Sequence, residues 1–117
     1  MKDATKEYSA AAKEFARLAL DSQVPYVVLQ NTHKAVEFAL SAYAIKKGLA
    51  LPRDHWQSAS LAHKISANFG KKFSELLRMY LGSYRLENGE KAKKAKQLML
   101  ELLKELEKYA GETFCPR

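Results

Sequence analysis

Three histidines, one cysteine and a group of basic residues are the side chains of this 117-residue chain that could do chemistry. His33, His55 and His63 lack the HxxxH or HExxH spacing by which one helix face presents two zinc ligands. Cys115 has no neighbouring base, so it is not expected to act as a nucleophile. The glycines stand too far apart to form a phosphate-binding loop. The sequence therefore predicts no catalytic residue, no metal site and no cofactor.

His33 and Glu37 are more informative, because a separation of four residues places both on one face of a helix. His33 also belongs to an apolar stripe with Leu29, Val36 and Leu40. A buried imidazole or carboxylate is costly unless it is hydrogen-bonded, so we expect a polar network around this pair. Two interpretations stay open: a structural network between helices, or the polar floor of a nucleotide or interface pocket.

An excess of positive charge marks the second half of the chain. The whole chain carries a net charge of +7, and residues 59–117 hold 12 basic and 7 acidic side chains. The densest group lies at the join between the last two predicted helices: Arg78, Arg85, Lys91, Lys93, Lys94 and Lys96. Cations at a helix N-terminus oppose its dipole, which favours anions there. We predict that four of them bind a nucleotide or its phosphates, although a solvated lysine face is the alternative: Arg85, Arg78, Lys91 and Lys94.

Five helices are expected to position these residues, because apolar residues recur at three- and four-residue spacings and no segment alternates with a period of two. The expected helices span residues 4–21, 25–47, 55–68, 71–84 and 90–109. Pro25 suits a first helical turn, Gly48 a helix end and Asp54 an N-cap. The predicted fold is all-α, a single-domain up-and-down bundle of about five helices.

The apolar stripes predict which residues face the core. The second helix is apolar on two faces, so we expect it at the centre of the bundle. The other inward residues are expected to be Tyr8, Ala11, Phe15 and Leu18, then Trp56, Leu61 and Ile65, then Phe73, Leu76, Leu77, Tyr80 and Leu81, and finally Ala95, Leu98, Leu102, Leu106 and Tyr109. Gly70 is expected to end the third helix. The domain should cover residues 1–110, followed by a flexible tail over residues 111–117.

Composition excludes several classes of protein. A content of 47% hydrophobic and 28% charged residues is typical of globular domains and excludes wholesale disorder. The longest charge-free stretch, residues 22–32, is far below the roughly 18 apolar residues of a membrane span. Charged residues interrupt every apolar run near the N-terminus, which excludes a signal peptide. We expect a cytoplasmic protein with an anionic partner and no membrane contact.

The segment HKAVEFALSA, residues 33–42, resembles the second-helix signature of HEPN domains, a family named for nucleotide binding. Gly48, Pro52 and His55 follow at spacings similar to those of the family. The segment YLGSYR, residues 80–85, resembles the tyrosine-rich fourth helix of HEPN domains. The resemblance covers about residues 4–109. It implies a helical bundle that forms homodimers.

Two departures from the family pattern bear on the expected activity. Ser41 stands where HEPN domains often have a lysine. Ribonucleases of the family carry a histidine a few residues after an arginine, but no histidine follows His63 in this chain. The general base for attack by an RNA 2′-hydroxyl is therefore missing after Arg85, which carries over only as a phosphate contact. The resemblance implies the non-catalytic branch, whose members bind nucleotides or a separately encoded minimal nucleotidyltransferase in toxin–antitoxin-like pairs.

Two other functions stay open. The chain could bind or cleave RNA through a non-standard active site, if folding brought His55 or His63 close to Arg85. Aromatic residues that would stack on single-stranded bases are absent between Lys91 and Lys96. Alternatively, the chain could be a structural dimerisation module in which the polar residues only fix the packing. Binding of a nucleotide or a protein partner is the preferred prediction.

Overall fold

The computed structural model describes residues 4–83 and 89–116 of the chain, and these ranges contain five helices and no strand. The helices are α1 (Ala4–Asp21), α2 (Pro25–Lys46), α3 (His55–Ile65), α4 (Ala67–Leu81) and α5 (Gly89–Ala110). The predicted all-α bundle is confirmed. None of the helices in the described ranges combines the length and hydropathy needed to cross a membrane.

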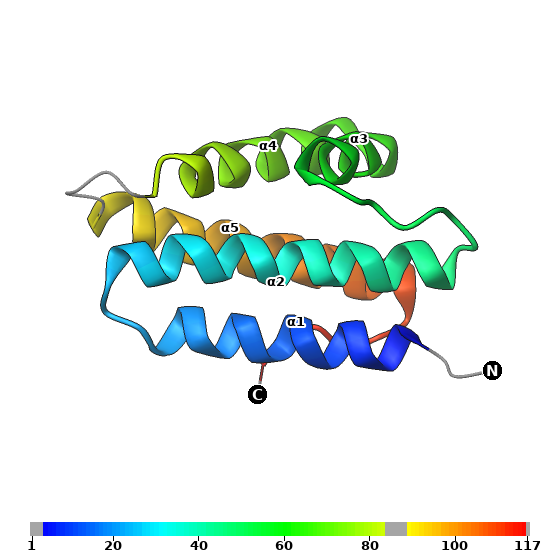
Figure 1. The fold of residues 1–117 in the computed structure, drawn as a ribbon, viewed down its shortest axis with the longest axis horizontal. Helices are drawn as coiled ribbons and strands as arrows, with labels where there is room; N and C mark the ends of the chain where they lie inside the picture. The colour runs from blue at the N-terminus through cyan, green and yellow to red at the C-terminus, as the bar shows by residue number, and fades with distance from the viewer. Residues whose placement is uncertain (1–3, 84–88, 117) are drawn as a thin grey trace.

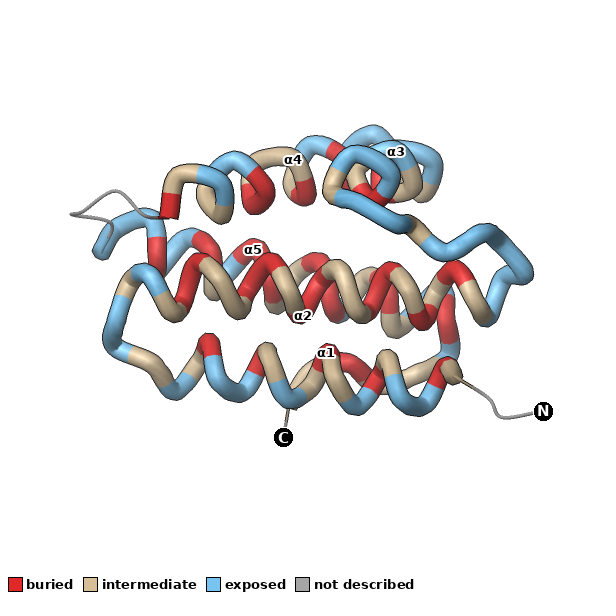
Figure 2. Tube along the Cα trace, viewed as in Figure 1, coloured by how far each residue is buried: buried red, intermediate tan, exposed pale blue. Residues whose placement is uncertain are grey.

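Helix α2 lies at the centre of the bundle. Figure 1 shows α1, α2 and α5 running side by side along the long axis, with α3 and α4 packed over this layer on the side away from α1. Helix α2 buries residues on more than one face, and the red segments of Figure 2 face its neighbours. Its position confirms the prediction from its two apolar stripes.

Local sequence signals define both ends of α2. Val24 is extended, as the residue before a proline tends to be, and Pro25 occupies the first helical turn. After the helix, Gly48 adopts a φ of 70°, a left-handed conformation that glycine takes without steric cost. Asp54 then N-caps α3, since its carboxylate accepts a hydrogen bond from the backbone N–H of Gln57 at 2.8 Å.

The join between α3 and α4 differs from the prediction. Helix α3 ends at Ile65 because Ser66 is extended, and the Ser66 hydroxyl accepts a hydrogen bond from the N–H of Phe69 as the N-cap of α4. Gly70 is therefore a residue of α4 and does not end α3. It allows a close approach of the two helices, because a Cβ atom at this position would lie 2.1 Å from Nδ1 of His63.

In α1 and α3 the fully buried residues are small, and four of the larger residues predicted to be inward are partly buried and pack against the core: Tyr8, Phe15, Leu61 and Ile65. Ala12, Ala16 and Ala19 are fully buried, which lets α1 approach α2 closely, whereas Leu18 is 47% exposed. Trp56, predicted to be inward, is 71% exposed. It lies two residues before the buried Ser58, which is about 200° around the helix and therefore on the opposite face.

The predicted core of α4 and α5 is largely confirmed. The buried residues there include Phe73, Leu76, Leu77, Ala95, Leu98, Leu102 and Leu106. Leu81 and Tyr109, at the last positions of their stripes, are exposed because each lies at a helix end where no neighbouring helix covers it.

The chain after α5 packs on the core up to Pro116, where we expected a flexible tail. Phe114 is fully buried in the main hydrophobic cluster. The Glu107 carboxylate accepts hydrogen bonds from the backbone N–H groups of Phe114 and Cys115, at 2.7 and 2.9 Å. These charge-assisted hydrogen bonds to Glu107 hold the chain after α5 in place, because the backbone hydrogen bonds of the helix end at Ala110.

Candidate functional site

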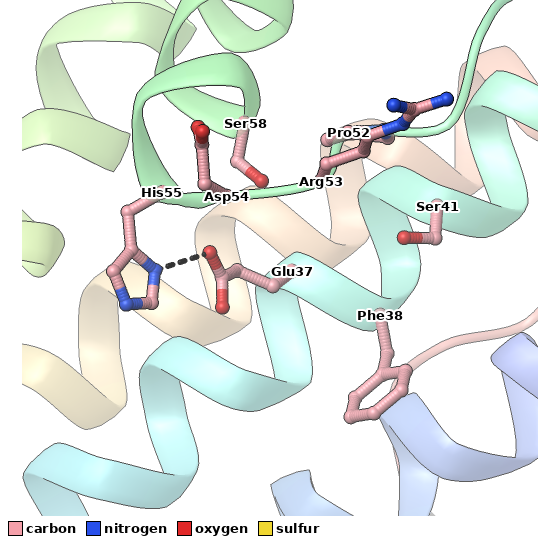
Figure 3. A pocket seen from close by; sticks show the side chains of 8 residues that line it. All are labelled: Glu37, Phe38, Ser41, Pro52, Arg53, Asp54, His55 and Ser58. Atoms are coloured by element: carbon pink, nitrogen blue, oxygen red, sulfur yellow. Dashed lines mark hydrogen bonds and ion pairs between the residues drawn. The ribbon is translucent and has the colours of Figure 1, made fainter.

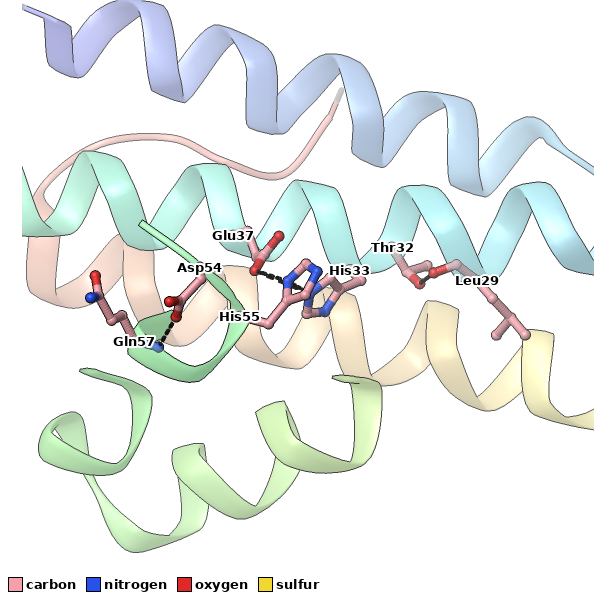
Figure 4. Close-up of polar contacts among 7 residues, drawn as sticks. All are labelled: Leu29, Thr32, His33, Glu37, Asp54, His55 and Gln57. Carbon is pink, nitrogen blue, oxygen red and sulfur yellow. Dashed lines mark hydrogen bonds and ion pairs between the residues drawn. The ribbon is translucent and has the colours of Figure 1, made fainter. Parts of the chain in front are cut away.

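Three polar side chains meet between α2 and α3, and we call them the histidine cluster: His33, Glu37 and His55. Oε2 of Glu37 lies 2.8 Å from Nδ1 of His55 and 3.2 Å from Nε2 of His33. The two histidine nitrogens lie 3.4 Å apart. Figure 4 shows both imidazoles directed at the same carboxylate. The predicted polar network around His33 and Glu37 is present, and His55 completes it.

Each member of the cluster is held by a helix. His33 and Glu37 lie one turn apart on α2, and His55 is the first residue of α3. The position of His55 follows from the Asp54 N-cap next to it, which is drawn with Gln57 in Figure 4. The Gln57 side chain supports the same turn, since its Oε1 accepts a hydrogen bond from the backbone N–H of Arg53 at 2.7 Å.

Aromatic rings surround the buried end of the cluster. The Tyr80 ring stacks on His33 with centroids 4.5 Å apart and meets His55 edge-on at 5.1 Å. Phe73 lies 5.3 Å from the His33 ring on another side. His33 is completely buried, whereas the side chains of Glu37 and His55 are 22% and 38% exposed. The cluster thus has a dry inner end and an open outer end.

The cluster holds Glu37 in its ionised form. Burial by itself raises the pKa of the Glu37 carboxyl, but hydrogen bonds and Coulombic attraction from His33 and His55 outweigh it. The pKa of Glu37 therefore lies below its ordinary value. Nδ1 of His33 is buried and has no hydrogen-bond partner among the described residues. Nε2 of His33 faces the carboxylate and donates the hydrogen bond to it, because an ionised carboxylate can only accept.

A pocket of about 400 Å³ opens beside the outer end of the cluster. Figure 3 shows it between α2 and the chain that enters α3. The residues that line it are Glu37, Phe38, Ser41, Pro52, Arg53, Asp54, His55 and Ser58. A volume in the range of about 300–1,000 Å³ is typical of sites for small molecules and cofactors.

Three of the four basic residues predicted to bind phosphate lie in the described part of the chain, on α4 and α5: Arg78, Lys91 and Lys94. Arg85 lies outside the described residues. Arg78 and Lys91 are exposed. Lys94 forms an ion pair with Glu75 at 2.5 Å.

Lys96 serves the fold. Its ammonium group donates hydrogen bonds to the backbone oxygens of Leu20 and Ser22 at 3.2 and 3.1 Å. These carbonyls belong to the end of α1, where a cation complements the helix dipole. One of the lysines at the start of α5 therefore secures the packing of α5 against α1.

His63 and Cys115 stay apart from the histidine cluster. His63 is exposed on α3, and its Nε2 lies 3.3 Å from the Ser74 hydroxyl. Cys115 lies after α5 beside the Glu107 carboxylate. Neither residue joins a group of three possible metal ligands in the described ranges, where the one such group is the histidine cluster.

Local spacing could not reveal the role of His55 and Arg53. His55 lies 22 residues from His33, and the two meet only because the connector after α2 turns back along that helix. Two signals pointed to His55 without placing it beside His33: Asp54 predicts a helix start and so puts His55 in a first turn, and the HEPN resemblance includes His55. Arg53 and Ser58 lie on either side of Asp54 but match no motif by themselves.

Comparison of the chain with protein-family models, with curated proteins and with solved structures finds no match.

Proposed function

We propose that this chain is a HEPN-like helical module that binds a nucleotide in the pocket between α2 and the start of α3. The observation that carries the proposal is the composition of the pocket wall, which combines an arginine and two serine hydroxyls with the apolar ring of Pro52. An arginine can hold a phosphate, hydroxyls can hold a ribose or phosphate, and an apolar wall can hold a base.

Arg53 supplies the cation of the proposed site. Its side chain is exposed at the rim of the pocket and forms no ion pair with any described residue. A guanidinium donates two parallel hydrogen bonds to a phosphate, which a lysine cannot do. Arg53 therefore replaces Arg85 as the phosphate contact that we test first.

Two carboxylates also line the pocket, and each accepts hydrogen bonds from the protein, which offsets part of its repulsion of an anion. Asp54 accepts the N–H of Gln57, and Glu37 accepts hydrogen bonds from both imidazoles. The net charge of +7 adds a long-range attraction for phosphates over the whole molecule.

Thermal unfolding with a series of nucleotides tests the proposal. A nucleotide present at about 100 times its Kd stabilises the folded protein by about 2.7 kcal/mol, which for a domain of this size raises Tm by about 10 °C. The series should contain ATP, ADP, GTP and AMP, with inorganic phosphate and a nucleoside as controls for the two halves of the ligand. A flat response across the series contradicts the proposal.

Two arginine variants decide where the phosphate binds. Loss of one charge-assisted hydrogen-bond contact weakens binding by about 10- to 100-fold. We expect this loss for Arg53→Ala and an unchanged Kd for Lys91→Ala on the exposed face of α5. If Arg85→Ala abolishes binding while Arg53→Ala does not, the ligand binds at the join of α4 and α5 and the proposed pocket is wrong.

Self-association and a protein partner form the second part of the proposal and rest on the HEPN resemblance. We propose a homodimer that works beside a separately encoded minimal nucleotidyltransferase. Equilibrium sedimentation at micromolar concentration tests the dimer, and a monomer at that concentration contradicts it. Co-expression with a nucleotidyltransferase encoded by a neighbouring gene tests the partner, with a stable complex in size-exclusion chromatography as the expected result.

RNA is the alternative ligand, favoured by the exposed cations Arg78 and Lys91. Binding to backbone phosphates would weaken steeply as salt is raised, whereas a nucleotide held in a pocket would respond less. Cleavage of labelled RNA that disappears in both Arg85→Ala and His55→Ala would establish a ribonuclease and displace the nucleotide proposal.

A further inference from the structure

We propose that the histidine cluster binds a divalent transition-metal ion of the zinc class, with its open coordination position facing the pocket. The ligand atoms are Nε2 of His33, Oε2 of Glu37 and Nδ1 of His55, which all lie within 4.8 Å of one another. Nucleotide binding is not required for this proposal, because the ion would be held by the protein alone.

The spacing of the three atoms fits the proposed ion. Tetrahedral ligands with bonds of about 2.0–2.1 Å lie about 3.3 Å apart. Two of the three distances in the cluster are close to this value, at 3.2 and 3.4 Å. The third is the 2.8 Å hydrogen bond between His55 and Glu37, which would lengthen by roughly half an ångström when the ion replaces its proton.

The ligand types select the class of ion. Two imidazole nitrogens and one carboxylate oxygen suit zinc and its transition-metal neighbours, whereas magnesium and calcium prefer oxygen ligands alone. Oε2 of Glu37 lies within hydrogen-bond distance of both imidazoles, and a carboxylate binds a metal in its ionised form. Three protein ligands leave a fourth position for water or for a ligand in the pocket, as catalytic zinc sites do.

The burial of the three residues shows on which side of the ion the fourth coordination position would lie. His33 closes the site from inside, under the Tyr80 ring. Glu37 and His55 are partly exposed, and both line the pocket in Figure 3. An ion at the cluster would therefore face the pocket, where its open position could accept a phosphate oxygen or a water molecule.

The surroundings of His33 predict a modest affinity. When Nε2 binds an ion, the imidazole proton must move to Nδ1, where no described residue accepts it. Histidine ligands usually donate this second N–H to an acceptor, and loss of such support weakens metal binding by about 10- to 100-fold. We therefore expect weaker binding than in a structural zinc site with a complete outer shell.

Titration of the metal-free protein tests the proposal. After treatment with a chelator and without nucleotide, Zn²⁺ should bind with a stoichiometry of one and raise Tm, while Mg²⁺ at the same concentration should not. Co²⁺ should give the visible absorption bands of a four- or five-coordinate ion. No saturable Zn²⁺ or Co²⁺ binding, or an equal response to Mg²⁺, would overturn the proposal.

Variants separate the cluster from other sites. We expect His55→Ala and Glu37→Gln each to weaken Zn²⁺ binding by on the order of 100-fold or more, since even an outer-shell partner is worth 10- to 100-fold. His63→Ala is the matched control, because His63 is an exposed histidine outside the cluster, and Cys115→Ser removes the thiol as a ligand. Circular dichroism checks that the variants are folded. Unchanged binding in folded His55→Ala, or loss in either control, contradicts the proposed site.

Discussion

The two histidines of the histidine cluster are far apart in sequence but close together in space, whereas the lysines at the start of α5 are neighbours in sequence but contact different helices. Lys91, Lys93, Lys94 and Lys96 lie within six residues, yet Lys94 pairs with Glu75 on α4 and Lys96 binds the end of α1. His33 and His55 are 22 residues apart, yet their nitrogens lie 3.4 Å from each other.

Helix geometry explains the difference. Successive residues point about 100° apart around a helix, so a run of like residues spreads over several faces. Residues that converge on one point come from different helices and are surrounded by protein on most sides. The lysines of the run therefore make separate contacts that are exposed or only partly buried. The cluster combines burial with mutual hydrogen bonds, which strengthens each interaction.

Removal of the His33 side chain should have the largest effect on stability. His33→Ala leaves a cavity under Tyr80 and removes one of the hydrogen bonds to Glu37. We expect the free energy of unfolding to fall by about 3 kcal/mol, as for other large buried side chains. Urea denaturation measures this change, with Lys93→Ala on the exposed face of α5 as the control. A loss below about 1 kcal/mol would show that the cluster is not part of the core.

Glu37 should make the stability of the metal-free protein depend on pH. Because its folded-state pKa is lowered, the ionised carboxylate adds stability above its ordinary pKa of 4.5, and this contribution is lost as pH falls through the folded-state pKa. Native protein should exceed Glu37→Gln by about 2 kcal/mol at pH 7, the value of a hydrogen bond to a charged group. The difference should shrink below pH 4.5 in denaturation series that contain a chelator. If the difference in stability between the native protein and Glu37→Gln did not change with pH, this prediction would be wrong.

Lys96 and Lys93 form a matched pair within the lysine run. Lys96→Ala should lower the free energy of unfolding by about 1 kcal/mol, because it removes two charge-assisted hydrogen bonds to α1 that are only partly buried. Lys93→Ala should change it by less than about 0.5 kcal/mol, as is usual for exposed positions. Equal effects in urea denaturation would mean that the run acts as one charged surface.

The smallest effects are expected from the ion pairs between α4 and α5. Lys72 and Glu101 lie 3.0 Å apart, and a hydrogen bond from Lys72 is the main cause that lowers the pKa of the Glu101 carboxyl. The pair is exposed, so Glu101→Gln should cost about 0.5 kcal/mol or less. Raising the salt concentration should remove the loss of stability caused by Glu101→Gln, whereas the loss caused by Glu37→Gln should persist. Equal salt dependence of the two variants would contradict the contrast between the regions.

Most of the fold could be predicted from short-range signals. Pro25, Gly48 and Asp54 mark helix ends through backbone conformation or capping, and each acts as predicted. Ser66 was missed because a serine between helix-forming residues can either continue a helix or cap the next one. Tertiary packing decides whether the helix continues or ends at this serine, and a short stretch of sequence carries no information about that packing.

Only those residues of the site that lie together on one helix could be predicted from the sequence. His33 and Glu37 were found because their spacing fixes a shared face of α2. His55 and Arg53 join them through the path of the connector between α2 and α3, which depends on how α3 and α4 pack on the bundle. The prediction of no metal site rests on spacing within single helices, and such spacing does not show which residues of different helices meet in the fold.

The close approach of His63 to Gly70 couples the effects of substitutions at these two positions. Alanine at position 70 would favour α4 by about 1 kcal/mol, but its methyl group would occupy the space that the His63 imidazole now fills. The exposed imidazole would have to turn aside and give up its contact with the Ser74 hydroxyl. The effect of alanine at position 70 on stability therefore depends on the residue at position 63, so substitutions at the two positions are not expected to be additive.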